Sequence, residues 1–168
     1  MTGLPIGDYG LLSDCRSAAL VSRAGSVDWL CFPRLDAPAV FARLLDPGGG
    51  YFAIRPAGGF EASRAYPDQT MALETTFRTA AGTAVLADAL AVGRNDRGHD
   101  LGAGSPGALL RRLACTNGTL EAAVTYAPPR IRPDPPDSGA VGVCWFRRPG
   151  ETSGARLVGG GSLLLLVW

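Results

Sequence analysis

The sequence of 168 residues has no lysine, one histidine and no long apolar run. Its sixteen basic residues are all arginine and are scattered, which we interpret as the coding bias of a GC-rich genome rather than as a phosphate-binding surface. A net charge of +1 and a pI near 7.7 give no electrostatic reason to expect nucleic acid or an anionic membrane as a partner. The longest apolar run, Leu163–Trp168, is far shorter than the roughly 18 residues of a membrane span.

Residues that bind metals are equally sparse. The four cysteines are far apart, no C-x-x-C motif occurs and the single histidine is His99, so the sequence predicts neither a metal site nor a cofactor. A hairpin centred on residues 24 and 25 would place Cys31 opposite Ala18 and out of register with Cys15, so we expect free thiols. The first eight residues lack the basic and apolar regions of a signal peptide, and a cytoplasmic protein is expected.

The residues that are abundant indicate a globular, turn-rich β protein. Apolar residues make up 46% of the chain and charged residues 18%, which is typical of folded rather than disordered sequences. The 23 glycines and 13 prolines separate short apolar or alternating segments. We therefore predict a mainly β fold, a partial antiparallel β-sandwich of the supersandwich type with one short helix.

Three pairs of segments predict β-hairpins. Their strands are residues 19–22 with 27–32, 71–79 with 83–92, and 108–116 with 120–126. Gly25 can supply a positive φ in the first turn, and Asn117-Gly118 in the third is the strongest two-residue turn signal in the chain. Further strands are expected at 51–55, 60–66, 141–146 and 163–168, with a polar loop at 93–107.

The expected helix runs from Ala39 to Leu45. Pro38 can begin it, and Asp36 stands where an N-cap residue is expected. Before it, Asp28 interrupts an apolar run beside Trp29, and a carboxylate in such a run needs a partner or an exit to water. We expect Trp29 itself to lie in the core.

Several motifs near the start of the chain resemble a known family. They are Ile6-Gly7-Asp8-Tyr9, Asp14-Cys15-Arg16, Ala18-Ala19-Leu20-Val21-Ser22, Gly25-Ser26-Val27-Asp28-Trp29-Leu30-Cys31 and Pro33-Arg34-Leu35-Asp36-Ala37-Pro38-Ala39-Val40-Phe41. Through these motifs the chain resembles glycoside hydrolase family 15, in particular its trehalase-like and glucoamylase-like members. The family usually has Phe and Ser where Leu35 and Ala37 stand. The likeness continues more thinly through 71–77 and 109–126, and ends near Ala127.

The resemblance implies an N-terminal β-sandwich that precedes a helical α/α barrel. In that family the barrel carries the two catalytic glutamates and hydrolyses α-glucosidic bonds with inversion. We therefore expect residues 1–127 to be a non-catalytic, trehalase-like N-terminal domain of a chain truncated before the barrel. Its expected partner is the missing barrel domain, which would bind the α-glucoside. The alternative is a stand-alone β-sandwich that binds carbohydrate or serves a structural role. A carbohydrate binder would be expected to expose a row of aromatic side chains.

No residue of this chain is expected to be catalytic. Asp28 and Asp36 could form the carboxylate pair that a glycosidase needs, but each has a simpler structural role at a strand edge or a helix cap. Three residues remain candidates for the rim of a substrate site: Trp29, whose ring could stack on a sugar, together with Arg34 and Asp36.

Residues 128–168 differ from the rest of the chain. They are rich in proline, arginine and glycine, and their five arginines against three acids give a charge of +2, whereas residues 1–127 carry −1. We expect this tail to be strongly divergent or frame-shifted, and residues 128–160 to be poorly ordered or loosely packed.

Overall fold

The structure is a computed structural model and describes residues 4–94, 97–127, 129, 152–159 and 162–167. A first layer contains η1 (Ile6–Asp8), a 3-10 helix, and the strands β1 (Tyr9–Ser13), β2 (Ala18–Ser22), β3 (Ser26–Cys31), β4 (Ala39–Phe41) and β5 (Tyr51–Pro56). A second layer contains β6 (Glu61–Ala65), β7 (Leu73–Arg78), β8 (Gly82–Leu90), β11 (Ser162–Val167) and the 3-10 helix η2 (Gly98–Asp100). β9 (Leu109–Ala127) belongs to both layers, and β10 (Thr152–Val158) pairs with its second half.

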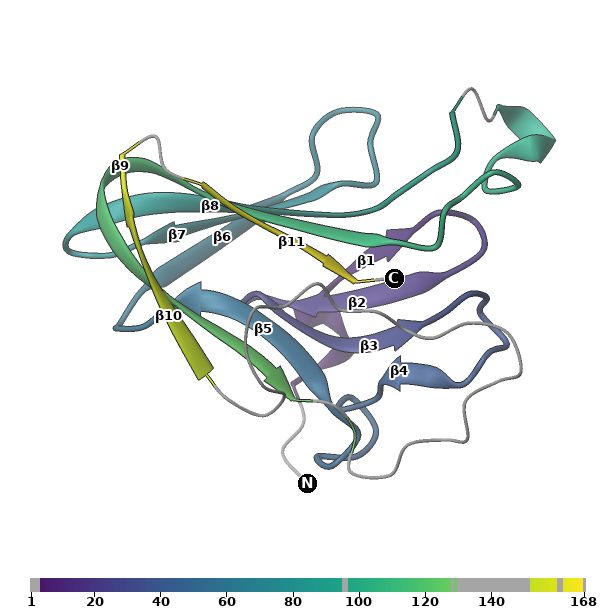
Figure 1. The fold of residues 1–168 in the computed structure, drawn as a ribbon, viewed down its shortest axis with the longest axis horizontal. Helices are drawn as coiled ribbons and strands as arrows, with labels where there is room; N and C mark the ends of the chain where they lie inside the picture. The colour runs from purple at the N-terminus through teal and green to yellow at the C-terminus, as the bar shows by residue number, and fades with distance from the viewer. Residues whose placement is uncertain (1–3, 95–96, 128, 130–151, 160–161, 168) are drawn as a thin grey trace.

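The strands form one antiparallel sheet that curls over itself (Figure 1). The strand order is β1-β2-β3-β5-β9-β8-β7-β6, with β10 and β11 paired to β9 and β4 paired to β3. Figure 1 shows β9, in green, bending from the upper layer into the lower one. The predicted mainly β sandwich is therefore confirmed, with β9 as the strand that joins its two layers.

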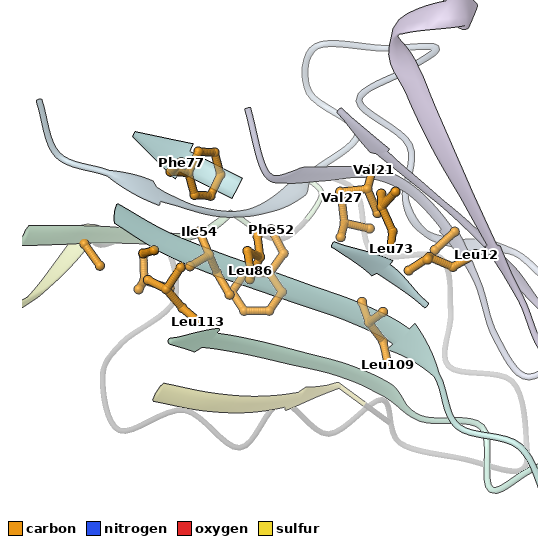
Figure 2. Packing of buried hydrophobic residues seen from close by; sticks show 14 of the residues in the cluster. Leu12, Val21, Val27, Phe52, Ile54, Leu73, Phe77, Leu86, Leu109 and Leu113 are labelled. Carbon is orange, nitrogen blue, oxygen red and sulfur yellow. The ribbon is translucent and has the colours of Figure 1, made fainter. Parts of the chain in front are cut away.

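Apolar side chains from both layers meet in one core (Figure 2). The first layer contributes Leu12, Val21, Val27, Phe52 and Ile54, and the second contributes Leu73, Phe77, Leu86, Leu109 and Leu113. Each is almost fully buried, and burying a side chain of this size stabilises a fold by about 1.5–3 kcal/mol. The alternation of buried and exposed residues along β7 and β8 matches the period of two that predicts strands.

Two of the three predicted hairpins are confirmed. β2 pairs with β3, and Ala18 lies opposite Cys31 as the sequence predicts. β7 pairs with β8, and the strands expected at 51–55 and 60–66 are β5 and β6. Cys15, Cys31 and Cys115 are free, while Cys144 lies outside the described residues.

The third predicted hairpin is wrong, because the chain does not turn at Asn117-Gly118. A two-residue type I′ turn needs a positive φ at both central residues, and here only Gly118 has one, at 68°. The register of β8 against β9 shifts at this point, since Thr83 faces Asn117 and Ala84 faces Cys115. The glycine therefore marks a β-bulge that bends a single 19-residue strand.

The predicted helix at 39–45 is also wrong. Residues 39–41 form β4, which pairs with β3, and the β-forming side chains Val40 and Phe41 suit a strand. The backbone amide of Leu44 then donates to the carbonyl of Asp28, so this group is not available for a helical bond. Asp36 consequently caps no helix.

β1 is a strand that the sequence did not predict, because its segment contains a glycine and lies beside turn residues. Gly10 faces the second layer, and a Cβ at this position would lie 2.5 Å from Leu73 Cδ2. The absence of a side chain therefore allows β1 to approach β7 closely.

Part of the tail is paired with β9. Residues 152–158 and 162–167 form β10 and β11, so the strand predicted at 163–168 is confirmed. The expectation of poor order or loose packing for residues 128–160 stays a prediction. The strand predicted at 141–146 lies outside the described residues. Whether the tail is divergent or frame-shifted stays a prediction.

Candidate functional site

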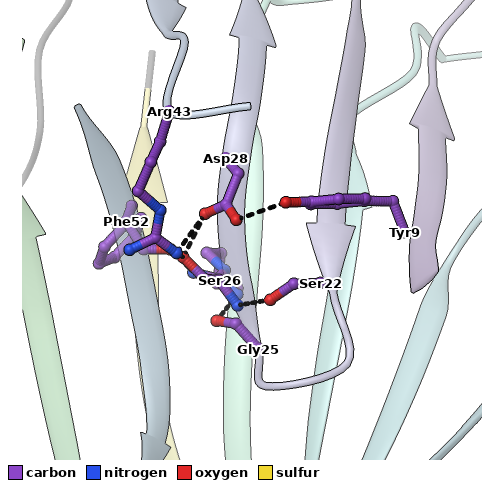
Figure 3. Close-up of polar contacts among 8 residues, drawn as sticks. Tyr9, Ser22, Gly25, Ser26, Asp28, Arg43 and Phe52 are labelled. Carbon is purple, nitrogen blue, oxygen red and sulfur yellow. Dashed lines mark hydrogen bonds and ion pairs between the residues drawn. The ribbon is translucent and has the colours of Figure 1, made fainter. Parts of the chain in front are cut away.

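A buried carboxylate lies on the side of the first layer that faces away from the core. Asp28 of β3 is only 2% exposed. Its Oδ2 accepts a hydrogen bond from the Tyr9 hydroxyl at 3.0 Å, and its Oδ1 accepts bonds from Ser26 Oγ and Arg43 Nη2, both at 2.6 Å (Figure 3). We call Tyr9, Ser26, Asp28 and Arg43 the Asp28 cluster. Its three donors satisfy the requirement that a carboxylate in an apolar run must have partners.

A β-bulge puts Asp28 in this position. Val21 of β2 faces Val27 of β3, but Leu20 faces Trp29, so Asp28 is an extra residue with no counterpart in β2. Val27 points into the core, and the bulge lets both Asp28 and Trp29 lie toward the outer side. The same irregularity corrects our expectation for Trp29, which is only partly buried and lies outside the core cluster.

The turn after β4 supplies the cation of the Asp28 cluster. Arg43 is 31% exposed at its side chain, and its guanidinium carbon lies 3.7 Å from the centroid of the Tyr51 ring. It contacts Asp28 through an ion pair and Tyr51 through a cation–π interaction, so it connects β3 to β5 across the outer surface. Because Asp28 and Arg43 carry opposite charges, their ion pair adds no net charge to the outer surface.

The cluster changes the acidity of Tyr9. Burial, and then the hydrogen bond to Asp28, raise the pKa of Tyr9 from 10.0 to about 12. The folded protein therefore binds more protons than the unfolded chain between these two pH values. The stability that this contact contributes is present below pH 10 and is lost as the pH rises through about 12.

We expect the stability advantage of the parent chain over Tyr9→Phe to shrink as the pH rises from 10 to about 12. Denaturant unfolding at a series of pH values measures this difference, and the tyrosinate absorbance that Tyr9→Phe removes reports the titration directly. A difference between the two proteins that stays constant across this window would contradict the contact.

Of the three predicted rim residues, two contact each other directly. Arg34 and Asp36 lie in the loop after β3 and bind each other through two hydrogen bonds of 2.9 and 3.2 Å, both side chains being exposed. Trp29 lies within β3, near the Cys31 thiol. The pKa of this thiol is raised because burial outweighs the opposing effect of the Trp29 indole. Trp29 thus lies on the sheet, and the Arg34–Asp36 pair on an exposed loop.

A general acid needs a raised pKa, and Asp36 has the opposite shift. Hydrogen bonding to Arg34 lowers the pKa of Asp36. Asp28 is enclosed by its three donors, so neither of its oxygens can reach a substrate. Within the described ranges no group of three or more His, Cys, Asp or Glu side chains could hold a metal ion.

Sequence reasoning missed a second buried ion pair. Arg111 of β9 and Asp88 of β8 are both 0% exposed, and the guanidinium donates to both carboxylate oxygens at 2.8 and 3.2 Å. Arg111 also donates to the carbonyl oxygens of Phe52 and Gly25, at 2.7 and 2.8 Å. This pair joins the two layers and has no access to a ligand.

Comparison with known proteins identifies the family of this chain. A family model described as trehalase-like, N-terminal, matches residues 2–134. The chain belongs to this family. The match extends slightly beyond Ala127, where we expected the likeness to end.

Two curated relatives are trehalases from mycobacteria. The trehalase of Mycolicibacterium smegmatis is 40% identical over 134 residues, and that of Mycobacterium tuberculosis is 37% identical over the same length. Each alignment covers 74% of this chain but 20% of the relative. Trehalase 1 of Sulfolobus acidocaldarius is 40% identical over 85 residues, which are 50% of this chain and 15% of the relative.

This chain therefore spans about a fifth of the length of the mycobacterial relatives that it matches. The similarity makes it a trehalase-like N-terminal domain of the non-catalytic kind. No solved structure matches the chain significantly. In the part of the chain that the structure describes, no helix is long and apolar enough to cross a membrane.

Proposed function

We propose that this domain supports the catalytic part of a glycosidase of family 15 that hydrolyses α-glucosidic bonds with inversion. Trehalose or a short α-glucan is the substrate class, and the chain acts in carbohydrate metabolism. The observation that carries the proposal is that the alignment occupies only a fifth of each mycobacterial trehalase. The assignment to family 15 rests on the opening motifs, which run from Ile6 through Phe41.

A cytoplasmic location is part of the same proposal. The three described cysteines are free thiols, which suits a reducing compartment. We also propose that Arg34 and Asp36 lie near the rim of the substrate site in the complete enzyme. Their exposed, mutually oriented charges could bind sugar hydroxyl groups.

The isolated chain should release no glucose from trehalose. Fused to the four fifths of the M. smegmatis trehalase that lie beyond the matched segment, the same chain should restore hydrolysis. Glucose release measures both, with the boiled fusion and the unfused M. smegmatis remainder as controls. Activity of the isolated chain that disappears in Asp28→Asn or Asp36→Asn would overturn the non-catalytic assignment, and a folded but inactive fusion would contradict the proposed support.

No observation favours the alternative of a stand-alone carbohydrate-binding module. Such a module would present a row of aromatic rings, but among the large apolar side chains exposed in the described residues the single aromatic is Tyr66. Its hydroxyl donates to the carbonyl of Leu11, so this residue also has a structural contact.

A further inference from the structure

We propose that the outer surface of β1, β2 and β3 is the face on which the catalytic part of the parent glycosidase docks. This inference rests on the proposed function and specifies the surface that performs it. Its centre is a row of three apolar side chains, Leu11, Leu20 and Trp29, which we call the outer row.

The register of the strands places these three side chains next to one another. Leu11 of β1 faces Leu20 of β2, and Leu20 faces Trp29 of β3. Because Gly10 and Leu12 point toward the second layer, Leu11 between them points away from it. Leu11 is 46% exposed, while Leu20 and Trp29 are partly buried. The sheet thus presents an apolar strip three strands wide on its outer side.

The surroundings of the outer row have the composition of a protein–protein interface. The Asp28 cluster, with Tyr9 and Arg43, lies next to the outer row. Asp28 balances the positive charge of Arg43, so the cluster carries no net charge. Two ion pairs lie at the ends of these strands. Asp8, just before β1, pairs with Arg23 in the turn between β2 and β3, and Arg34 pairs with Asp36 in the loop after β3. An apolar centre with polar pairs at its margin is typical of surfaces that bind an uncharged, complementary protein face.

Exposed apolar side chains concentrate in this part of the chain. Of the nine large apolar residues exposed in the described ranges, five lie between residues 4 and 45: Leu4, Ile6, Leu11, Leu35 and Leu45. β1 also ends the strand order of the sheet. Exposed apolar side chains that gather in one part of a fold are typical of interaction sites.

The length of the relatives identifies the occupant. The alignment accounts for 20% of each mycobacterial trehalase, so four fifths of such a protein belong to the same polypeptide as this domain. A domain that belongs to the same polypeptide docks at high effective concentration and needs only a modest apolar area. We therefore assign the outer row to the remainder of the parent chain, rather than to a second copy or to a separate protein.

A thiol footprint tests the assignment. Leu11→Cys and Met71→Cys are placed in the full chain after Cys15 and Cys144 have been replaced by serine. Leu11 and Met71 are matched, since they are 46% and 47% exposed, but Met71 lies beside the second layer, just before β7. Each variant is labelled with a maleimide, first in the isolated chain and then in the fusion to the M. smegmatis remainder described above.

We expect the Leu11→Cys variant to be labelled at least about tenfold more slowly in the fusion than in the isolated chain, and the Met71→Cys variant to be labelled at the same rate in both.

Equal rates for position 11 in the two proteins would overturn the docking face, while an active fusion would leave the proposed function standing. Protection at position 11 in an inactive fusion would support docking and contradict the function. Slower labelling at both positions indicates general shielding, and also counts against this face. Sedimentation of the isolated parent chain, with Leu11 in place and under reducing conditions, tests the second copy: a dimer would refute the assigned occupant.

Discussion

Replacing Arg111 with methionine is expected to lower the free energy of unfolding by about 3–5 kcal/mol, a large share of the 5–15 kcal/mol that holds a typical domain together. The cost arises because Asp88, which is 0% exposed, would keep its charge without a partner in the core. The carbonyl oxygens of Phe52 and Gly25 would lose their donor in the same variant. Denaturant unfolding of the parent and variant chains measures the difference.

The neighbouring arginine provides the control. Arg112 lies on the same strand but is exposed, so Arg112→Met should change the free energy of unfolding by less than about 0.5 kcal/mol. A double variant that combines Arg111→Met with Asp88→Leu removes the stranded charge and should recover part of the loss. Recovery should be incomplete because the two carbonyl oxygens still lack a donor. Equal effects of Arg111→Met and Arg112→Met would show that the buried pair contributes nothing specific.

The position of Arg111 illustrates how far sequence patterns could predict this fold. Leu109, Arg111 and Leu113 alternate with the residues between them, so a strand here places all three on one face. The alternation therefore predicts that the side chain of Arg111 points into the core together with those of its apolar neighbours. Its partner could not be predicted, because Asp88 faces Arg111 only in the particular register of β8 against β9.

The Asp28 cluster shows the same limit. The interrupted apolar run predicts that Asp28 has a partner, but Tyr9 and Arg43 reach it from opposite sides, through a strand and a turn that the sequence did not predict. Trp29 was assigned to the core because a bulge cannot be read from an apolar run. Local signals therefore predicted β2, β3, β5, β6, β7, β8 and β11, whereas contacts that depend on register or on a bulge were missed.

Replacing Gly25 with alanine is expected to destabilise the chain by about 2–5 kcal/mol, because the new Cβ meets two separate penalties. The backbone at Gly25 has φ of +71°, which L side chains rarely adopt. A Cβ there would also lie 2.3 Å from the carbonyl oxygen of Ile54 and 3.0 Å from Leu86 and Phe77. The carbonyl of Gly25 accepts from Arg111, so a displaced turn would disturb the buried pair as well.

Alanine substitutions at two other glycines, Gly98 and Gly58, separate the cost of backbone strain from the cost of the steric contact. Gly98 has φ of +56° and no atom within 4 Å of the place that a Cβ would occupy, so Gly98→Ala should cost only the backbone strain, about 1–2 kcal/mol. Gly58 has neither the positive φ nor a close neighbour, and Gly58→Ala should be neutral or slightly stabilising. Chemical denaturation ranks the three variants. A loss of unfolding free energy in Gly25→Ala no larger than that in Gly98→Ala would contradict this explanation. The contacts of the new Cβ with Ile54, Leu86 and Phe77 would then not be the reason for a glycine at this turn.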